Sequence, residues 1–465
     1  MDLAYSLNTF YFLLSGVLVM FMAAGFTMLE AGSVRSKNVI EILIKNIALY
    51  SVASITYLLL GYSIMYGWNE PPDHALMADF FFQVVFVATA MSVVSGAVAE
   101  RKRLYTFLLF AAIFTALIYP IQGAWSWGGG FLSELGFSDF AGSGIVHMAG
   151  AAAALAAVLL IGPRIGKYDW NGNPQPIHGS NAVAVTLGTL ILWFGWFGFN
   201  GGSQLSIVGM DNANAVAQIF VNTNTAAAAG LLSAMLLSKL WLGKTALNAV
   251  CNGALAGLVV ITADPVTPSP QMAVVYGALG GLVVPLSMSY LEKWGIDDPV
   301  GAISVHGVAG ILGLMLVPIL NTDATFLAQG IGTLTIFSFV FGTSYVVWYI
   351  MKKTIGIRPT REEEVGGQVF KWYTRPAFER HLWKLGWQGA RVTVETCTER
   401  QCMRALRTTS DELRQFPIER QRLKPYAGPQ CFPHLKDPAR VHANREEAGA
   451  TAEVSADAAR KQLTE

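Results

Sequence analysis

Two stretches of this chain each place a histidine eight residues after an aspartate, at the start of a long apolar run. They read Asp139-Phe-Ala-Gly-Ser-Gly-Ile-Val-His147 and Asp298-Pro-Val-Gly-Ala-Ile-Ser-Val-His306. An ionisable side chain in a membrane-length apolar run is costly, so it marks a functional site by default. Matching residues in two halves of a membrane protein indicate internal repeats that share one central pathway. The pattern therefore predicts a transport path lined by both histidines.

The two histidines are expected to meet near the bilayer midplane, because each lies about 9 Å inside its run at 1.5 Å per residue. A neutral imidazole pair can hydrogen-bond to itself and still offer a donor or acceptor to a small polar molecule. Two other interpretations stay open. Each histidine could be a satisfied core residue, or the pair could ligate a haem, although no further histidine or methionine pairing supports a haem.

Composition places the chain among polytopic membrane proteins. Of its 465 residues, 53% are hydrophobic and only 14% charged. Residues 1–353 hold 13 Lys+Arg and 16 Asp+Glu, and residues 354–465 hold 19 and 15, so the two parts carry −3 and +4 and sum to +1. We therefore divide the chain into a transmembrane domain (1–353) and a cytoplasmic tail (354–465). Three of the four cysteines, Cys397, Cys402 and Cys431, lie in that tail without a metal-binding spacing.

Crossing the hydrocarbon core takes about 20 apolar residues, and the chain contains eleven such runs. They cover roughly 9–32, 43–66, 79–98, 104–121, 141–162, 180–200, 214–238, 245–262, 272–291, 300–320 and 329–351. We expect an all-α membrane protein in which spans 1–5 and 6–10 form two inverted five-helix repeats, followed by an eleventh helix. Among the connections between spans, only alternate ones contain Arg or Lys, such as Arg101-Lys102-Arg103, which predicts an N-terminus outside and a cytoplasmic C-terminus.

Aromatic and small polar residues gather at the predicted outer mouth. Trp127 precedes three glycines, Phe82 and Phe86 lie one turn apart, and Phe199 and Ser203 close the sixth run. An aromatic face attracts a small cation, and a hydroxyl adds a hydrogen-bond acceptor. The alternative is an interfacial aromatic belt. Asp139 could likewise attract a cation, but accepting N–H bonds at a helix N-terminus is its expected direct contact.

Several motifs closely resemble those of the ammonium transporter family (Amt/Mep/Rh). They run through about residues 10–355 in the family's order and spacing. They are Gly25-Phe-Thr-Met-Leu-Glu-Ala-Gly-Ser-Val-Arg-Ser-Lys-Asn38, Gly96-Ala-Val-Ala-Glu-Arg101, Trp127-Gly-Gly-Gly130, Asp139-Phe-Ala-Gly, Val146-His147, Trp196-Phe-Gly-Phe-Asn200, Phe220-Val-Asn-Thr and Asp297-Asp-Pro with Val-His306-Gly. The resemblance implies an eleven-helix fold assembled as a homotrimer in the cell membrane, with one pore per subunit.

The same resemblance implies roles for individual residues. Trp127, Phe86 and Ser203 would form an external ammonium recruitment site supported by Asp139. Phe86 and Phe199 would stack as a gate, and His147 and His306 would line a hydrophobic pore for ammonia. A desolvated ammonium ion enters such a pore with difficulty, whereas neutral ammonia enters it easily. Potassium cannot lose a proton, so deprotonation would separate two ions of similar size.

The tail departs from the family pattern. After Glu364 it reads Val365-Gly-Gly-Gln-Val-Phe-Lys-Trp-Tyr and continues for about ninety Arg-rich residues. Residues 365–465 could be a regulatory segment, a partly disordered extension or a change of reading frame. This segment motivates a rival hypothesis, an ammonium receptor that signals through the tail. It also leaves room for a cytoplasmic regulatory partner. We expect no enzymatic activity, cofactor, metal or nucleic-acid partner, because no motif for any of them is visible.

Overall fold

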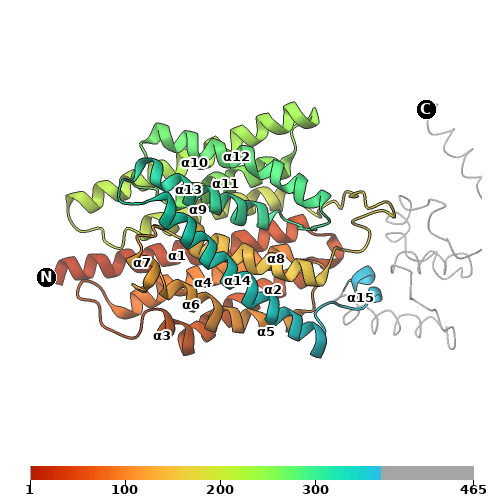
Figure 1. The fold of residues 1–465 in the computed structure, drawn as a ribbon, viewed down its shortest axis with the longest axis horizontal. Coiled ribbons are helices and arrows are strands. Elements are labelled where there is room, and N and C mark those ends of the chain that lie inside the picture. The colour runs from red at the N-terminus through yellow and green to blue at the C-terminus, as the bar shows by residue number, and fades with distance from the viewer. Residues whose placement is uncertain (1, 368–465) are drawn as a thin grey trace, which may run out of the picture. The chain divides into compact units, whose positions relative to one another are not determined.

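The computed structural model describes residues 2–367, and these form a bundle of long helices that run side by side (Figure 1). The N-terminus lies at one end of the bundle and helix α15 at the other (Figure 1). The N-terminal half contains α1 (Asp2–Ser33), η1 (Ser36–Asn38), α2 (Val39–Thr56), η2 (Tyr57–Gly61), α3 (Tyr62–Met65), α4 (Leu76–Ala97), α5 (Leu104–Ile113), η3 (Phe114–Ile118), α6 (Tyr119–Ala124), α7 (Phe131–Glu134), η4 (Ser143–Met148) and α8 (Ala149–Ile161).

The remaining described elements follow a long loop. They are α9 (Ala182–Gly202), α10 (Met210–Leu242), α11 (Leu247–Thr262), α12 (Pro270–Lys293), η5 (Ile303–Val308), α13 (Ala309–Leu320), α14 (Phe326–Thr354) and α15 (Arg361–Gly366). Segments η2, η3, η4 and η5 are π-helical turns inside longer helices. The predicted tail lies largely outside the described residues.

The expected all-helical membrane fold is confirmed. Ten helices of the described chain are long and apolar enough to cross a membrane. The eighth predicted run corresponds to α11, whose 16 residues span about 24 Å, less than the roughly 30 Å of a hydrocarbon core. The predicted count of eleven therefore rests on whether this shorter helix is counted as a span.

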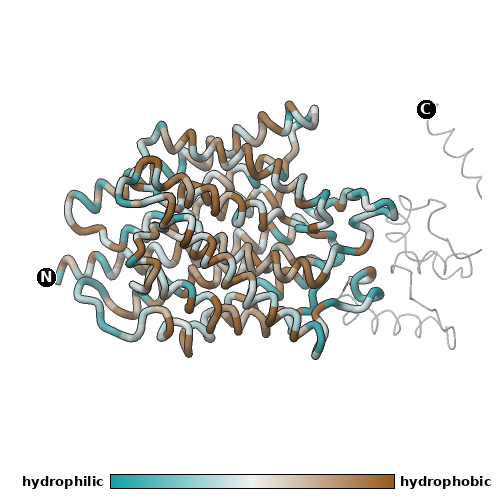
Figure 2. The backbone as a smooth tube through the Cα atoms, in the orientation of Figure 1, coloured by the Kyte–Doolittle hydropathy of each residue, from teal (hydrophilic) through white to brown (hydrophobic). Residues whose placement is uncertain are grey.

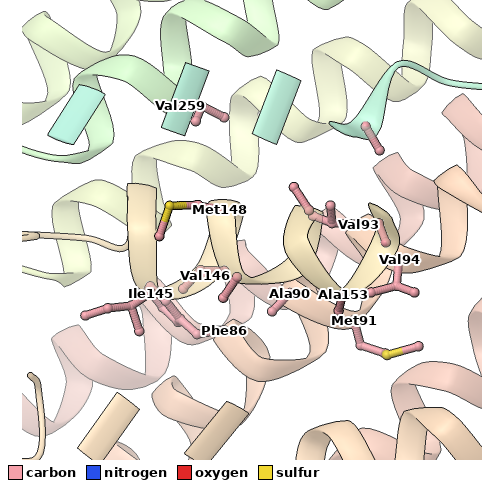
Figure 3. Packing of buried hydrophobic residues seen from close by; sticks show 14 of the residues in the cluster. Phe86, Ala90, Met91, Val93, Val94, Ile145, Val146, Met148, Ala153 and Val259 are labelled. Carbon is pink, nitrogen blue, oxygen red and sulfur yellow. The ribbon is translucent and has the colours of Figure 1, made fainter. Parts of the chain in front are cut away.

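Burial separates central helices from peripheral ones. The most apolar 18-residue stretch is 89% buried in α4 and also in the continuous η4–α8 helix. The corresponding stretch of α14 is only 28% buried. Figure 3 shows side chains of α4, such as Phe86 and Ala90, beside Val146 and Met148 of η4. In α11 every residue from Cys251 to Thr262 is buried. Figure 2 shows hydrophobic residues along the helices and hydrophilic ones concentrated in the connections.

Small residues allow the helices of the second half to approach closely. A Cβ atom added to Gly277 of α12 would lie 2.1 Å from the carbonyl oxygen of Ala226 in α10, and one added to Gly257 of α11 would lie 2.2 Å from the same oxygen. Neither position has room for a side chain. Small residues at helix crossings are the usual means of tight packing in membranes, where apolar burial alone does not drive association.

A network of buried ions connects the loops at the α15 end of the bundle. The Asp297 carboxylate accepts two bonds from the Arg164 side chain (Nη2–Oδ1 2.8 Å, Nε–Oδ2 2.9 Å), and the Arg101 side chain donates to the Asp297 carbonyl oxygen. Burial by itself would raise the pKa of Asp297, but the bonds from Arg164 and the charge of Arg101 hold this pKa at about 2. Glu100, buried and with a positive φ of 72°, pairs with Arg35.

Helix α15 is attached to the same network. Its Glu364 carboxylate accepts bonds from Arg358 (2.8 Å to Nε) and from the backbone N–H of Ile165 (2.8 Å), and Lys37 donates to the Glu364 carbonyl oxygen. A capping box at Thr360 and Glu363 begins this helix. Glu364 thus holds the first residues after the last long helix against Lys37 and against the loop that follows α8.

Removing the central carboxylate should destabilise the bundle. Asp297→Asn leaves the buried Arg164 guanidinium without its bidentate partner, which costs roughly 3–5 kcal/mol. Thermal unfolding in detergent should show this loss, whereas Asp323→Asn in an exposed loop should stay within about 0.5 kcal/mol of wild type.

Because the pKa of Asp297 is lowered from 3.8 to about 2, its stabilising charge is present above pH 3.8 and lost as the pH falls toward 2. The difference between wild type and variant should shrink over that interval, and equal unfolding of the two proteins at neutral pH would contradict the prediction.

Candidate functional site

His147 and His306 meet inside the bundle. Their Nδ1 atoms lie 3.1 Å apart, their ring centroids 5.1 Å apart, and their planes differ by 20°. Both side chains are buried. The expected juxtaposition of the two repeats is therefore present in the structure. The Nε2 atom of His147 has no hydrogen-bond partner within the described chain, so it is available to a small polar molecule.

A hydrogen bond between two Nδ1 atoms restricts the protonation of the pair. In a neutral pair, one ring carries its proton on Nδ1 and the other on Nε2. One Nε2 is then an acceptor and the other a donor. Two imidazolium rings would instead place two positive charges 3.1 Å apart in an apolar interior, which is strongly unfavourable. The pair therefore offers directional hydrogen bonds without a fixed charge.

Each histidine is carried on a π-helical turn whose start is capped by the aspartate of its repeat. Asp139 accepts backbone N–H bonds from Gly142 (3.2 Å), Gly144 (2.9 Å) and Ile145 (2.8 Å) before η4. π-Helical turns inside longer helices occur frequently at functional sites. The capping contact expected of Asp139 is confirmed. Burial raises the pKa of Asp139 to about 6, opposed by these same backbone bonds.

The second repeat uses the same construction. Asp298 accepts backbone bonds from Val300 (3.3 Å), Gly301 (3.0 Å) and Ile303 (2.7 Å) at the start of η5. Burial raises the pKa of Asp298, and the bonds from the η5 backbone oppose this rise. The residue three positions after each aspartate is a glycine with positive φ, 105° at Gly142 and 80° at Gly301. This backbone conformation is accessible to glycine at little cost and explains the repeated glycine.

Aromatic rings extend from the histidine pair toward the Trp127 loop. His147 stacks on Phe199 at 5.3 Å, and Phe199 stacks on Phe86 at 4.1 Å. The rings of Phe86 and Trp127 pack edge to face, with their centroids 6.0 Å apart and their planes at 77°. The Trp127 indole N–H donates to the Asp139 carbonyl oxygen (2.9 Å), so the aspartate loop fixes the tryptophan as well. Five predicted site residues therefore form one continuous row: Trp127, Phe86, Phe199, His147 and His306.

Ser203 occupies a different position from the others. It follows α9, and its hydroxyl donates to the carbonyl oxygen of Phe199 (2.9 Å), one turn earlier. This bond leaves the Ser203 oxygen with acceptor capacity. No hydrogen bond or ring contact joins Ser203 to Trp127 or Phe86 within residues 2–367, so the structure links it to the row through Phe199 alone.

A buried polar network supports the His147 ring from behind. Trp196 stacks on His147 at 5.0 Å and 19°, and its indole N–H donates to the Thr262 hydroxyl (2.8 Å). Thr262 lies within hydrogen-bonding distance of Asn200 Oδ1 (3.0 Å), and Asn200 donates to Thr223 (3.0 Å). Trp196 and Asn200 belong to a motif noted in the sequence, but their positions next to the histidine were not predicted.

Comparison with known proteins decides the family. The model of the family described as "Ammonium Transporter Family" matches residues 10–375. The chain belongs to the ammonium transporter family. It is 42% identical over 399 residues to "Ammonium transporter Amt2" of Archaeoglobus fulgidus, covering 76% of this chain and 84% of that protein. A second relative, "Ammonium transporter Amt2" of Methanocaldococcus jannaschii, is 33% identical, with 81% and 92% covered.

Solved structures agree with this assignment. "Sensor Amt Protein" is 34% identical to this ammonium transporter family member and superimposes with a TM-score of 0.75, covering 78% of this chain and 97% of that one. Candida albicans Mep2 has a TM-score of 0.70 at 24% identity, with 77% and 87% covered, which shows the shared fold.

Two charged residues in this ammonium transporter family chain were missed by the sequence reasoning. Glu30 of α1 and Lys45 of α2 are completely buried and form an ion pair of 2.6 Å. Both lie within predicted spans, at 9–32 and 43–66. The rule that selected the histidines, that an ionisable residue inside a membrane span marks a site, applies to them equally and would have found them.

Removing a cap should disturb the histidine it supports. Asp139→Ala leaves three buried N–H groups without their acceptor, and each unpaired group costs about 1–3 kcal/mol. Asp298→Ala should have a similar effect because it makes three equivalent bonds. Thermal unfolding of the solubilised protein measures both. Glu134→Ala, on the surface near the same end, is the control. Unfolding of Asp139→Ala at the wild-type temperature would show that the carboxylate does not hold this turn.

Proposed function

We propose that this protein transports ammonium across the membrane, by recruiting ammonium at Trp127, deprotonating it, and passing ammonia between His147 and His306. The observation that carries the proposal is the continuous row from Trp127 through Phe86 and Phe199 to the paired histidines. Membership of the ammonium transporter family supports it. Passage through the apolar row favours a neutral molecule, because a bare ion loses its hydration there.

Each step of the proposal has a chemical basis. The faces of Trp127 and Phe86 attract ammonium through the ring quadrupole, and the Ser203 oxygen can accept one of its N–H bonds. Ammonium then transfers a proton to solvent water at the outer mouth, leaving neutral ammonia before the gate. The stacked Phe86 and Phe199 rings close the path below and act as a gate. Ammonia continues to His147 Nε2, which has acceptor or donor capacity according to the tautomer. Asp139 supports recruitment by holding Trp127 in place.

The orientation and assembly are part of the same proposal. Arg35, Arg101 and Arg164 lie in connections at the α15 end, while the loop that carries Trp127 has no basic residue. Basic residues favour the cytoplasmic side. The α15 end is then cytoplasmic, and the N-terminus and Trp127 face outside. We also infer a homotrimer in the cell membrane, in which each subunit has its own pore, with the tail available to a cytoplasmic regulatory protein.

A second function, an ammonium sensor on the same scaffold, has one specific observation in its favour. The solved structure titled "Sensor Amt Protein" is 34% identical to this chain. The unusual sequence after Glu364 would then carry a signal. The transport proposal is better supported, because the relatives reported above are named ammonium transporters and both histidines are present.

The histidine pair supplies a direct test. His147→Ala or His306→Ala should lower ammonium uptake into proteoliposomes by about tenfold or weaken the exclusion of potassium, since one hydrogen bond contributes about 0.5–1.5 kcal/mol and about 1.4 kcal/mol is tenfold in rate. His147→Asp should admit cations, because a buried carboxylate attracts bare ions. Flux and potassium exclusion equal to wild type in both alanine variants would reduce the pair to packing.

Trp127→Leu should act on recruitment rather than on the pore. Losing a cation–π contact of about 0.5–2 kcal/mol weakens the apparent affinity for ammonium by roughly threefold to thirtyfold. Potassium exclusion should be unchanged, since the histidines are retained. The concentration dependence of ammonium uptake gives the apparent affinity. A Trp127→Leu protein that leaks potassium with unchanged ammonium affinity would place selectivity at the mouth and contradict the proposed order of steps.

Truncation separates the transporter from the sensor. A protein ending at Gly367 keeps α15 and the Glu364 contacts. We expect this protein to retain ammonium flux in proteoliposomes, because the row of site residues lies entirely before that point. A sensor would show no flux in the full-length protein and would lose its signalling response on truncation. Folded full-length protein that carries no ammonium would overturn the transport proposal.

A further inference from the structure

A small cavity lies directly beyond the histidine pair, on the side away from Trp127. His306, Phe26, Glu30, Ser92, Asn252 and Val300 are among the residues that line it, and its volume is about 10 Å³. Such a volume is close to the minimum that holds one water molecule. Ammonia is of similar size. A molecule that leaves His306 in this direction therefore enters a cavity that Glu30 also lines.

The Glu30 carboxylate is held by two donors from different helices. Lys45 Nζ donates to Oε2 at 2.6 Å, and the Ser95 hydroxyl donates to Oε1 at 2.7 Å. Lys45 also donates to the Ser95 carbonyl oxygen at 3.0 Å. Each carboxylate oxygen has two acceptor sites, so these bonds leave capacity for a further N–H donor. Glu30 and Lys45 are both completely buried, and their charges cancel.

We propose that Glu30, neutralised by Lys45, is a specificity-determining residue at the inner end of the pore. Its carboxylate accepts a hydrogen bond from neutral ammonia that leaves His306. Because Lys45 cancels its charge, the carboxylate does not stabilise a bare cation that enters the cavity from the cytoplasm. This inference rests on the proposed transport function and adds a second selectivity element to it.

A neighbouring ion pair provides a matched control. Lys102 pairs with the buried Glu41, and the ammonium groups of Lys102 and Lys45 each lie 5.6 Å from the centre of the Phe107 ring. Glu41 does not line the cavity, whereas Glu30 does. Lys45→Met and Lys102→Met each remove a buried lysine and leave its carboxylate. Only Lys45→Met leaves an uncompensated carboxylate, that of Glu30, in the proposed path.

The experiment measures ammonium and potassium fluxes of these variants in proteoliposomes. The charged and titratable groups around Glu30 are Lys45, His306 across the cavity, and Lys102, which acts on it electrostatically. In Lys45→Met, potassium permeability should rise about tenfold or more, because the Glu30 carboxylate then lacks the cation that pairs with it. Lys102→Met should exclude potassium as wild type does.

Two further variants separate charge from folding. The double variant Glu30→Gln with Lys45→Met has no charge in the cavity, so it should exclude potassium again while its ammonium flux stays below wild type. Ser95→Ala retains both charges and removes one bond to Glu30, so it should lower ammonium flux without a potassium leak. This milder variant keeps the test decisive if Lys45→Met does not fold.

The outcomes are distinguishable. Wild-type protein without ammonium flux would defeat the proposed function itself. If wild type conducts, two results overturn the role of Glu30. The first is exclusion of potassium by Lys45→Met, and the second is full ammonium flux in both Ser95→Ala and the double variant. A purely structural ion pair would lower only the thermal stability of these proteins.

Discussion

The central constraint in this molecule is that two buried imidazole rings must be held with their Nδ1 atoms 3.1 Å apart inside a membrane-spanning bundle. Lipid offers no hydrogen bonds, so the protein itself must satisfy the backbone groups that position these rings. The protein meets the constraint with two carboxylates, each placed at the start of the turn that carries a histidine and each accepting three backbone bonds. The positions of the histidines therefore depend on Asp139 and Asp298 as much as on the helices.

The rest of the architecture follows from this arrangement. His147 lies on the π turn η4 and His306 on the π turn η5. The helices α4 and α11, which are almost completely buried, enclose both histidines. Buried ion pairs lie around Asp297 and near Phe107, and the buried Asp139 carboxylate lies at the Trp127 end. The row itself consists of aromatic and imidazole rings, with charged groups before and beyond it.

Much of this could be predicted from the sequence, for identifiable physical reasons. Apolar runs of membrane length are unambiguous, so the long helices were located, and the Asp-to-His spacing showed which residues correspond between the halves. The eighth run was predicted as a span like the others, whereas α11 has only 16 residues and is buried along most of its length. Ser203 was grouped with Trp127 by motif, while the structure connects it only to Phe199. Glu30 and Lys45 were missed because they lie fifteen residues apart in the sequence. Only the packing of α1 against α2 brings them together as an ion pair.

The Nδ1–Nδ1 contact has a consequence for the tautomers of the pair. The two halves of the protein are built alike, yet a single shared proton makes the two rings unequal at any moment. The surroundings of the rings also differ, because His147 stacks on Trp196 and Phe199 while His306 lies against Phe26. The two tautomeric states of the pair are therefore not equivalent, and each presents its donor Nε2 on a different ring.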